Sequence, residues 1–125
     1  MISIVDDDES VREATKGLVR SLGYVAATFA SSEEFLNSDR VNDTSCLITD
    51  VQMPGLNGLE LQSRLTAMGR CIPIIFVTAF PQEQTRRRAL KAGAFGFLSK
   101  PFTDDNLILC LDRAIAAGDR DDVEQ

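Results

Sequence analysis

The side chains of this sequence that could do chemistry are carboxylates, a few hydroxyls and one lysine, placed just after short apolar runs. The run Ile2–Val5 is followed by four acids: Asp6, Asp7, Asp8 and Glu9. Like charges repel, so this cluster costs stability unless it is a solvated helix start or faces a cation. Later runs are followed in the same way by Asp50, by Thr78 and by Lys100. Two or three carboxylates suit Mg²⁺, one of them can attack a phosphoryl group, and a lysine can offset its charge.

The sequence contains no histidine. This absence removes Ser–His–Asp and Cys–His catalysis and histidine metal sites. Phosphate chemistry here must therefore use carboxylates, lysine or hydroxyls, and any phosphohistidine must belong to a partner. The three cysteines, Cys46, Cys71 and Cys110, fit neither a zinc motif nor a disulfide framework, and we expect reduced thiols that fill the core.

Length and charge narrow the class of protein. With 125 residues the chain is expected to form one domain with a full core. A formal net charge of −6 argues that this domain binds no nucleic acid, because phosphates need a basic surface. Neither a membrane-length apolar run nor a signal peptide is present, so we expect no membrane association and a cytoplasmic location.

Short apolar runs alternate with amphipathic stretches. Strands are predicted at Ile2–Val5, Tyr24–Phe29, Cys46–Thr49, Ile74–Val77 and Phe95–Ser99. Helical spacing follows each strand, with capped starts expected at Ser31, Asn57 and Thr103, a fourth helix over Gln82–Lys91, and ends at Gly23, Gly69 and Gly93. Five β–α units predict an α/β fold in which a parallel sheet carries helices on both faces. We interpret residues 1–118 as the domain and 119–125 as a polar tail or the start of a linker.

In an open α/β sheet, ligands bind outside the carboxyl ends of the strands. The residues that follow the strands should therefore meet at one edge. They are Asp6, Asp7, Asp50, Thr78 and Lys100. Taken alone, each of these residues has an ordinary structural explanation, such as a helix start, a turn or a surface lysine. Their placement after successive strands favours a single site.

Four segments, "IVDDDESV", "ITDVQMPGLNG", "VTA" and "FLSKPF", resemble the receiver domain of bacterial two-component response regulators. The resemblance covers residues 2 to about 117. It implies a flavodoxin-like fold with strand order 2-1-3-4-5. It also implies a phosphorylation-dependent signalling switch rather than an enzyme, which takes a phosphoryl group from a histidine kinase or phosphotransfer protein.

The same resemblance implies a role for each site residue. Asp50 would accept the phosphoryl group. Asp7 would be the main ligand of Mg²⁺, with Asp50, the main-chain carbonyl of Gln52 and, partly through water, Asp6. Lys100 would pair with the acceptor or its phosphoryl group, with a cis peptide before Pro101. Thr78 would be the switch hydroxyl and Phe97 the switch aromatic.

Two alternatives remain open at this point. "DDDES" also resembles the nucleophile loop of haloacid-dehalogenase-type phosphatases, which would make Asp6 the nucleophile. In that family a distal acidic motif follows a strand, whereas Gly118-Asp119 follows a helical segment. The chain also has no obvious room for the part of such phosphatases that covers the site and selects the substrate. A degenerate receiver that only docks partners is disfavoured, because no key position is missing.

The resemblance also places partner contacts on the face made by the fourth helix, fifth strand and fifth helix. Basic residues on the fourth helix could meet acidic residues on the fifth: Arg86, Arg87, Arg88 and Lys91 against Asp104, Asp105 and Asp112. A phosphorylation-dependent homodimer is therefore an expectation, as is a C-terminal DNA-binding output domain if the natural chain is longer. Near the acceptor, Gln52 and Phe80 offer little to orient water, which predicts slow self-dephosphorylation.

Overall fold

The computed structural model describes the backbone of residues 1–124 and the side chains up to Ala117. Its strands are β1 (Ile2–Val5), β2 (Ala26–Phe29), β3 (Cys46–Asp50), β4 (Ile74–Thr78) and β5 (Gly96–Ser99). Its helices are α1 (Glu9–Ser21), α2 (Ser32–Leu36), the 3₁₀ helix η1 (Asp39–Asp43), α3 (Gly58–Ala67), α4 (Glu83–Lys91) and α5 (Asp104–Glu124).

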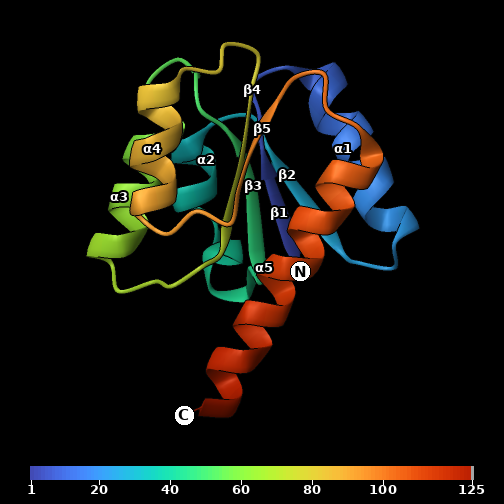
Figure 1. Cartoon of the computed structure of the whole chain (residues 1–125), viewed down its shortest axis with the longest axis vertical. Coiled ribbons are helices and arrows are strands. Elements are labelled where there is room, and N and C mark those ends of the chain that lie inside the picture. The colour runs from blue at the N-terminus through green and yellow to red at the C-terminus, as the bar shows by residue number, and fades with distance from the viewer. Residues whose placement is uncertain (125) are drawn as a thin grey trace.

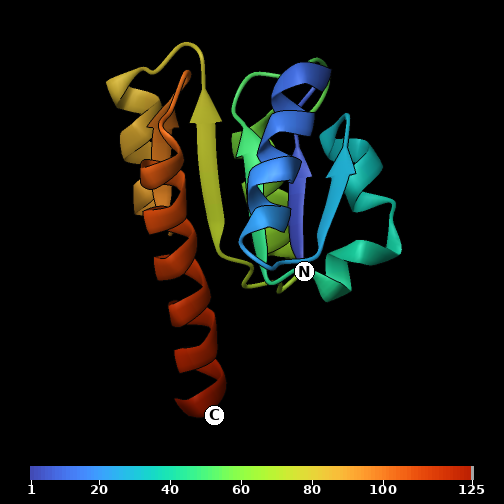
Figure 2. The same ribbon diagram turned by 90° about the vertical axis from the view of Figure 1, so that its right-hand side faces the viewer.

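The five strands form one parallel sheet in the order β2-β1-β3-β4-β5. In Figure 1, α2, α3 and α4 cover one face of the sheet, and α1 and α5 cover the other. Figure 2, which looks onto α1 and α5, shows the arrowheads of the strands at a common edge. The predicted α/β fold, with helices on both faces and the strand order implied by the resemblance, is confirmed.

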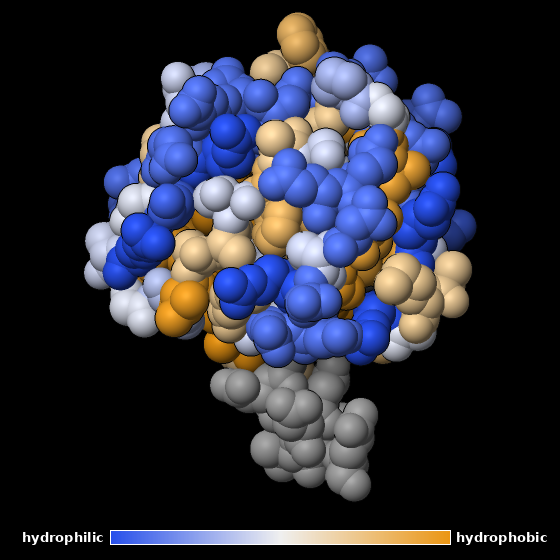
Figure 3. All heavy atoms as spheres, turned by 180° about the vertical axis from the view of Figure 1, so that it is seen from behind, coloured by the Kyte–Doolittle hydropathy of each residue, from blue (hydrophilic) through white to orange (hydrophobic). Residues whose placement is uncertain are grey.

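Continuous apolar runs place the central strands in the core. Every residue of β1, β3 and β4 is buried, as expected for parallel strands covered on both sides. One hydrophobic cluster includes Phe35 and Phe76, and the other includes Ile48 and Leu111. On the β2 side of the molecule, several hydrophobic patches are visible between hydrophilic residues (Figure 3).

Side-chain caps fix where several helices begin. The Ser31 hydroxyl accepts from the Glu34 amide at 3.0 Å, and Thr103 accepts from the Asn106 amide at 3.2 Å. Asn57 and Glu60 form a reciprocal capping box at the start of α3. These predicted starts are confirmed, because each side chain satisfies an amide that the helix itself leaves unbonded.

Some predicted boundaries were wrong by one or two residues. Strand β2 begins at Ala26 rather than Tyr24, whose amide bonds instead to the Val19 carbonyl at the end of α1. Helix α4 begins at Glu83, with Gln82 as its N-cap. The 3₁₀ helix η1, capped by the Ser38 hydroxyl, was not predicted from the sequence.

The C-terminal segment also differs from the prediction. Helix α5 extends to Glu124, so the residues 119–124 expected as a tail continue the helix, and Gln125 lies outside the described residues. Whether the domain boundary falls at residue 118 stays a prediction. Cys71 is exposed, which corrects its assignment to the core, while Cys46 is buried. Within residues 1–124, no helix combines the length and apolar character needed to span a membrane.

Candidate functional site

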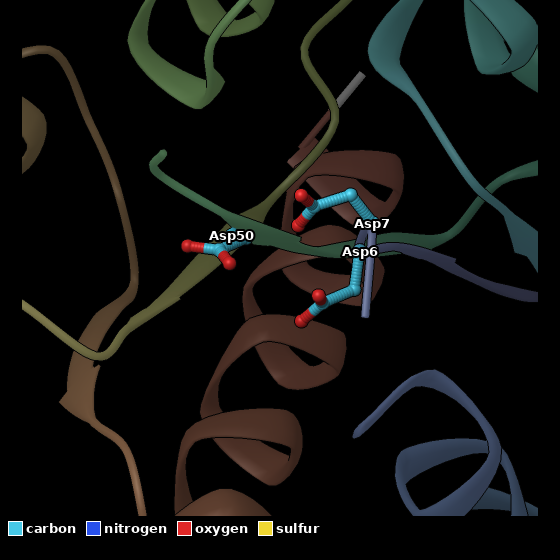
Figure 4. A group of neighbouring side chains, drawn as sticks. All are labelled: Asp6, Asp7 and Asp50. Carbon is cyan, nitrogen blue, oxygen red and sulfur yellow. The ribbon is translucent and has the colours of Figure 1, made fainter. Parts of the chain in front are cut away.

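The carboxylates of Asp6, Asp7 and Asp50 meet at the carboxyl edge of the sheet. One oxygen from each lies within 4.8 Å of the others. Figure 4 shows Asp6 and Asp7 leaving the end of β1 and Asp50 leaving the end of β3, with their carboxylates gathered in one place. The convergence predicted from the sequence is therefore present in the structure.

Asp6 is the buried member of the pair that follows β1. Its side chain is 2% exposed. Its Oδ1 accepts from the Asp8 amide at 2.9 Å, and its Oδ2 accepts from Lys100 Nζ at 2.9 Å. Asp7 is exposed. Because both Asp6 oxygens already have partners, Asp7 is the more available ligand for a cation.

Lys100 reaches the carboxylates from the loop after β5. Its Nζ lies 2.8 Å from Asp50 Oδ2 as well as 2.9 Å from Asp6 Oδ2. Burial by itself lowers the pKa of Lys100, but the hydrogen bonds and charges of Asp50 and Asp6 outweigh it, so the net pKa is raised. The peptide bond between Lys100 and Pro101 is cis, as the resemblance implied.

Asp50 is the last residue of β3 and is 7% exposed. Its Oδ1 accepts from the Gln52 amide at 3.1 Å. Together with the Lys100 bond, this contact fixes both oxygens of the carboxylate. Gln52 itself is exposed, and its main chain belongs to the loop directly after β3.

Thr78 ends β4 and is almost completely buried. Its hydroxyl oxygen accepts from the Phe80 amide at 3.1 Å, which leaves its proton to be donated elsewhere. Its main-chain carbonyl accepts from the Lys100 amide at 2.7 Å. The proposed switch hydroxyl and the site lysine are therefore joined through the main chain.

Phe97 lies on β5, is half-buried and packs against the hydrophobic cluster on the α2–α3–α4 face. Its ring centroid lies 6.4 Å from that of Phe76 on β4. Phe80 is 68% exposed, so its ring extends into solvent and covers less of the site than its position in the sequence suggested.

Two contacts at the site were missed by the sequence analysis. Arg12 Nη1 on α1 donates to the main-chain carbonyl of Asp6 at 2.8 Å. The Lys100 ammonium group donates to Asp6 as well as to Asp50. An arginine in an amphipathic helix gives no signal of such a contact, because arginines at exposed helix positions are ordinary.

The donor set fits Mg²⁺. This ion prefers oxygen ligands, uses one or two carboxylates and keeps several waters. Among the residues with described side chains, Asp6, Asp7 and Asp50 are the one group of three side chains placed to hold a metal ion. Asp7 is exposed, so waters can complete the coordination.

Comparison with known proteins agrees with this geometry. Residues 2–112 match the family model described as the response regulator receiver domain. Nodulation protein W of Bradyrhizobium diazoefficiens is 43% identical over 121 residues, which are 97% of this chain and 52% of that protein. The response regulator protein TodT of Pseudomonas putida is 42% identical over 108 residues, 86% of this chain and 48% of that protein. The chain thus spans about half the length of these curated relatives.

Solved structures show the same likeness. The response regulator StyR superposes with a TM-score of 0.91 at 39% identity, over 98% of this chain and 62% of that one. The structure titled FixJ-N gives a TM-score of 0.82 at 33% identity, over 92% of both chains. The phosphatase alternative is not favoured, because Gly118 and Asp119 lie within α5 rather than after a strand. The chain belongs to the response regulator receiver domain family, and it is a signalling domain of a two-component system.

Proposed function

We propose that Asp50 accepts a phosphoryl group from a phosphohistidine on a kinase or phosphotransfer protein. The observation that carries this proposal is the bridge from Lys100 to Asp50 and Asp6, with Asp7 beside them. The supply of a phosphohistidine by a partner is consistent with the absence of histidine from this chain. A cytoplasmic location remains part of this proposal.

In the transfer, a carboxylate oxygen of Asp50 forms a bond to phosphorus as the bond from phosphorus to the partner's imidazole nitrogen breaks. The electron pair of the broken bond remains on the imidazole. The ammonium group of Lys100 would stabilise the negative charge on the transferred phosphoryl group, because its Nζ already lies 2.8 Å from Asp50 Oδ2.

Asp7, Asp50 and the Gln52 carbonyl would hold Mg²⁺, with Asp6 contributing partly through water. When bound, this ion supplies positive charge to the phosphoryl oxygens. The proposal keeps Asp6 in the outer position that the resemblance implies, and the 2% exposure of its side chain is consistent with a contact through water.

The phosphoryl group would be sensed by Thr78, whose free hydroxyl proton can be donated to a phosphoryl oxygen. Movement of Thr78 would let Phe97 turn inward from its half-buried position. Such a shift requires that the phosphoryl group favour one of two states. The resulting change would appear on the surface of α4, β5 and α5.

That surface is proposed to form a homodimer after phosphorylation. On it, Leu90 of α4 and Leu109 of α5 are 37% and 51% exposed. Light scattering with and without beryllofluoride, a phosphoryl mimic, should show tighter self-association of the wild type and no change in Thr78→Ala. If beryllofluoride changed the self-association of both proteins equally, Thr78 would not couple the phosphoryl group to this surface.

Two relatives, TdiR of Thauera aromatica and FixJ of Azorhizobium caulinodans, are described as transcriptional regulatory proteins. This description supports the proposal that, in a longer natural protein, the domain would control a DNA-binding output domain.

The proposal is tested by intact-mass measurement after incubation with acetyl phosphate and Mg²⁺. The wild type should gain the mass of one phosphoryl group, and Asp50→Asn should gain none. Labelling that persists in Asp50→Asn but is lost in Asp6→Asn would instead support the phosphatase-like chemistry. Asp43→Asn, an exposed acid on η1, is the matched control and should label like the wild type.

A further inference from the structure

Gly58, the first residue of α3, packs directly against the main chain at the end of β3. A Cβ atom built on Gly58 would collide with the carbonyl oxygen of Asp50 and would lie 3.0 Å from the Cα atom of Val51. Main-chain atoms cannot swing aside as the end of a long side chain can. Any side chain at position 58 would therefore shift α3 or the end of β3.

The two segments are already held together at this point. Gly58 is buried, and its amide donates to the Val51 carbonyl at 2.8 Å. Because the helix start is tied to the residue directly after Asp50, α3 cannot move away freely. The strain of an added side chain would be passed to the strand end that carries Asp50.

The Asp50 carboxylate has little freedom to follow such a shift. Its oxygens lie 2.8 Å from Lys100 Nζ and 3.1 Å from the Gln52 amide nitrogen. Lys100 is also bonded to Asp6, so it cannot track Asp50 without loosening that contact. Group transfer is sensitive to such displacements, and a misplacement of about 1 Å can cost roughly a hundredfold in rate.

We propose that Gly58 is a positioning residue for the phosphoryl acceptor: its missing side chain lets α3 sit against the Asp50 main chain and so fixes where the carboxylate lies. This role rests on the proposed function of Asp50. Gly17 in α1 provides the contrast, since an added Cβ there would meet nothing within 4 Å.

Gly58→Ala should lower the rate of Asp50 labelling at saturating acetyl phosphate by at least about tenfold, while the half-saturating donor concentration changes less than about twofold. Gly17→Ala should label at the wild-type rate. If the wild type itself is not labelled, the proposed function fails. If it is labelled and Gly58→Ala matches its rate, only the positioning role of Gly58 fails.

A second variant distinguishes displacement of the Asp50 main chain from crowding of the neighbouring Phe76 ring. The Cβ atom at position 58 would also lie 3.0 Å from Cε1 of Phe76, a side chain that Phe76→Leu shortens. Gly58→Ala should therefore cost less unfolding stability in the Phe76→Leu background than alone, while its labelling rate stays at least about tenfold below that of Phe76→Leu. Equal rates for Phe76→Leu and the double variant would show that ring crowding alone matters, and would overturn the proposal. This comparison remains decisive if Gly58→Ala alone does not fold.

Discussion

The ammonium nitrogen of Lys100 lies 2.8 Å from Oδ2 of Asp50, although the two residues are 50 positions apart in the sequence. The same nitrogen bonds Asp6, so one cation connects the ends of β1 and β3 to the loop after β5. Three carboxylates and one ammonium group leave a surplus of negative charge at this edge of the sheet. A divalent cation bound beside these carboxylates would offset that surplus.

Replacing Lys100 should destabilise the fold, because the carboxylates that it bonds would repel each other without its positive charge. Lys100→Met should lower the free energy of unfolding at pH 7 in EDTA by about 3 kcal/mol, because it leaves two buried carboxylates without their shared cation. Saturating Mg²⁺ should recover part of that loss. Urea unfolding measures both effects, with Lys16→Met as control, since the Lys16 ammonium lies 3.7 Å from the exposed carboxylate of Glu13. A Lys100→Met protein as stable as the wild type would contradict the account.

Asp7 tests the metal assignment without breaking an ion pair. Charges about 4.8 Å apart repel by roughly 3 kcal/mol at an effective dielectric of about 20. Solvent at the exposed Asp7 reduces this, so Asp7→Asn should stabilise the metal-free protein by about 1 kcal/mol and remove most stabilisation by Mg²⁺. Thermal melts in EDTA and in Mg²⁺ provide the measurement, with Asp43→Asn as control. A variant that melts lower in EDTA, or keeps the full Mg²⁺ response, would argue against this role.

Stability should fall in alkali because of Cys46. Burial is the main cause that raises the pKa of this thiol from 9.0 to about 12, and the nearby Cys110 adds to it. Between these values the unfolded chain has lost the proton while the folded chain keeps it, so stability falls as pH rises, by up to about 1.4 kcal/mol per pH unit. The raised pKa of Lys100 adds a further loss above about pH 10.5, where the lysine of the unfolded chain has lost its proton and that of the folded chain keeps it.

Denaturant unfolding from pH 8 to pH 11 measures this slope. Cys46→Ala should be less stable than the wild type at pH 8, because it leaves a small cavity, but should show a shallower decline. Cys71→Ala, at an exposed cysteine, should keep the wild-type slope. The same slope in all three proteins would exclude Cys46 as the cause.

The lifetime of the phosphorylated state depends on how water reaches Asp50. The Phe80 ring is 68% exposed, so it shields the site only in part. We expect Phe80→Glu, which can orient water, to raise the rate of phosphate release about threefold, or roughly 0.7 kcal/mol of barrier. Release is followed after removal of the donor, with Val25→Glu, at an exposed residue before β2, as control. No acceleration in Phe80→Glu would mean that position 80 does not govern water access.

The positions of the strands and the identity of the converging acids followed from the sequence, because apolar runs and their flanking residues are local features. The strand order did not: it came from the resemblance. Boundaries such as the start of β2 depend on where α1 ends, since the Tyr24 amide is taken by the Val19 carbonyl. Such competition between neighbouring elements is settled by tertiary contacts rather than by local pattern.

The finer structure of the site was the least predictable part. The bond from Lys100 to Asp6 joins residues 94 positions apart, and the contact of Arg12 with the Asp6 carbonyl depends on how α1 packs. The close packing of Gly58 on Asp50 had one signal in the sequence, a glycine at the first position of a helix. That signal alone does not distinguish a tight contact from an ordinary turn.

The central claim is that Asp50 is the residue that carries the phosphoryl group. Borohydride reduces an acyl phosphate to the alcohol, so trapping the acetyl phosphate-treated protein should convert one aspartate into homoserine, which peptide mass spectrometry can locate. The account predicts homoserine at position 50 in the wild type, dependent on Mg²⁺. Homoserine at position 6 or 7, with position 50 unchanged, would contradict it.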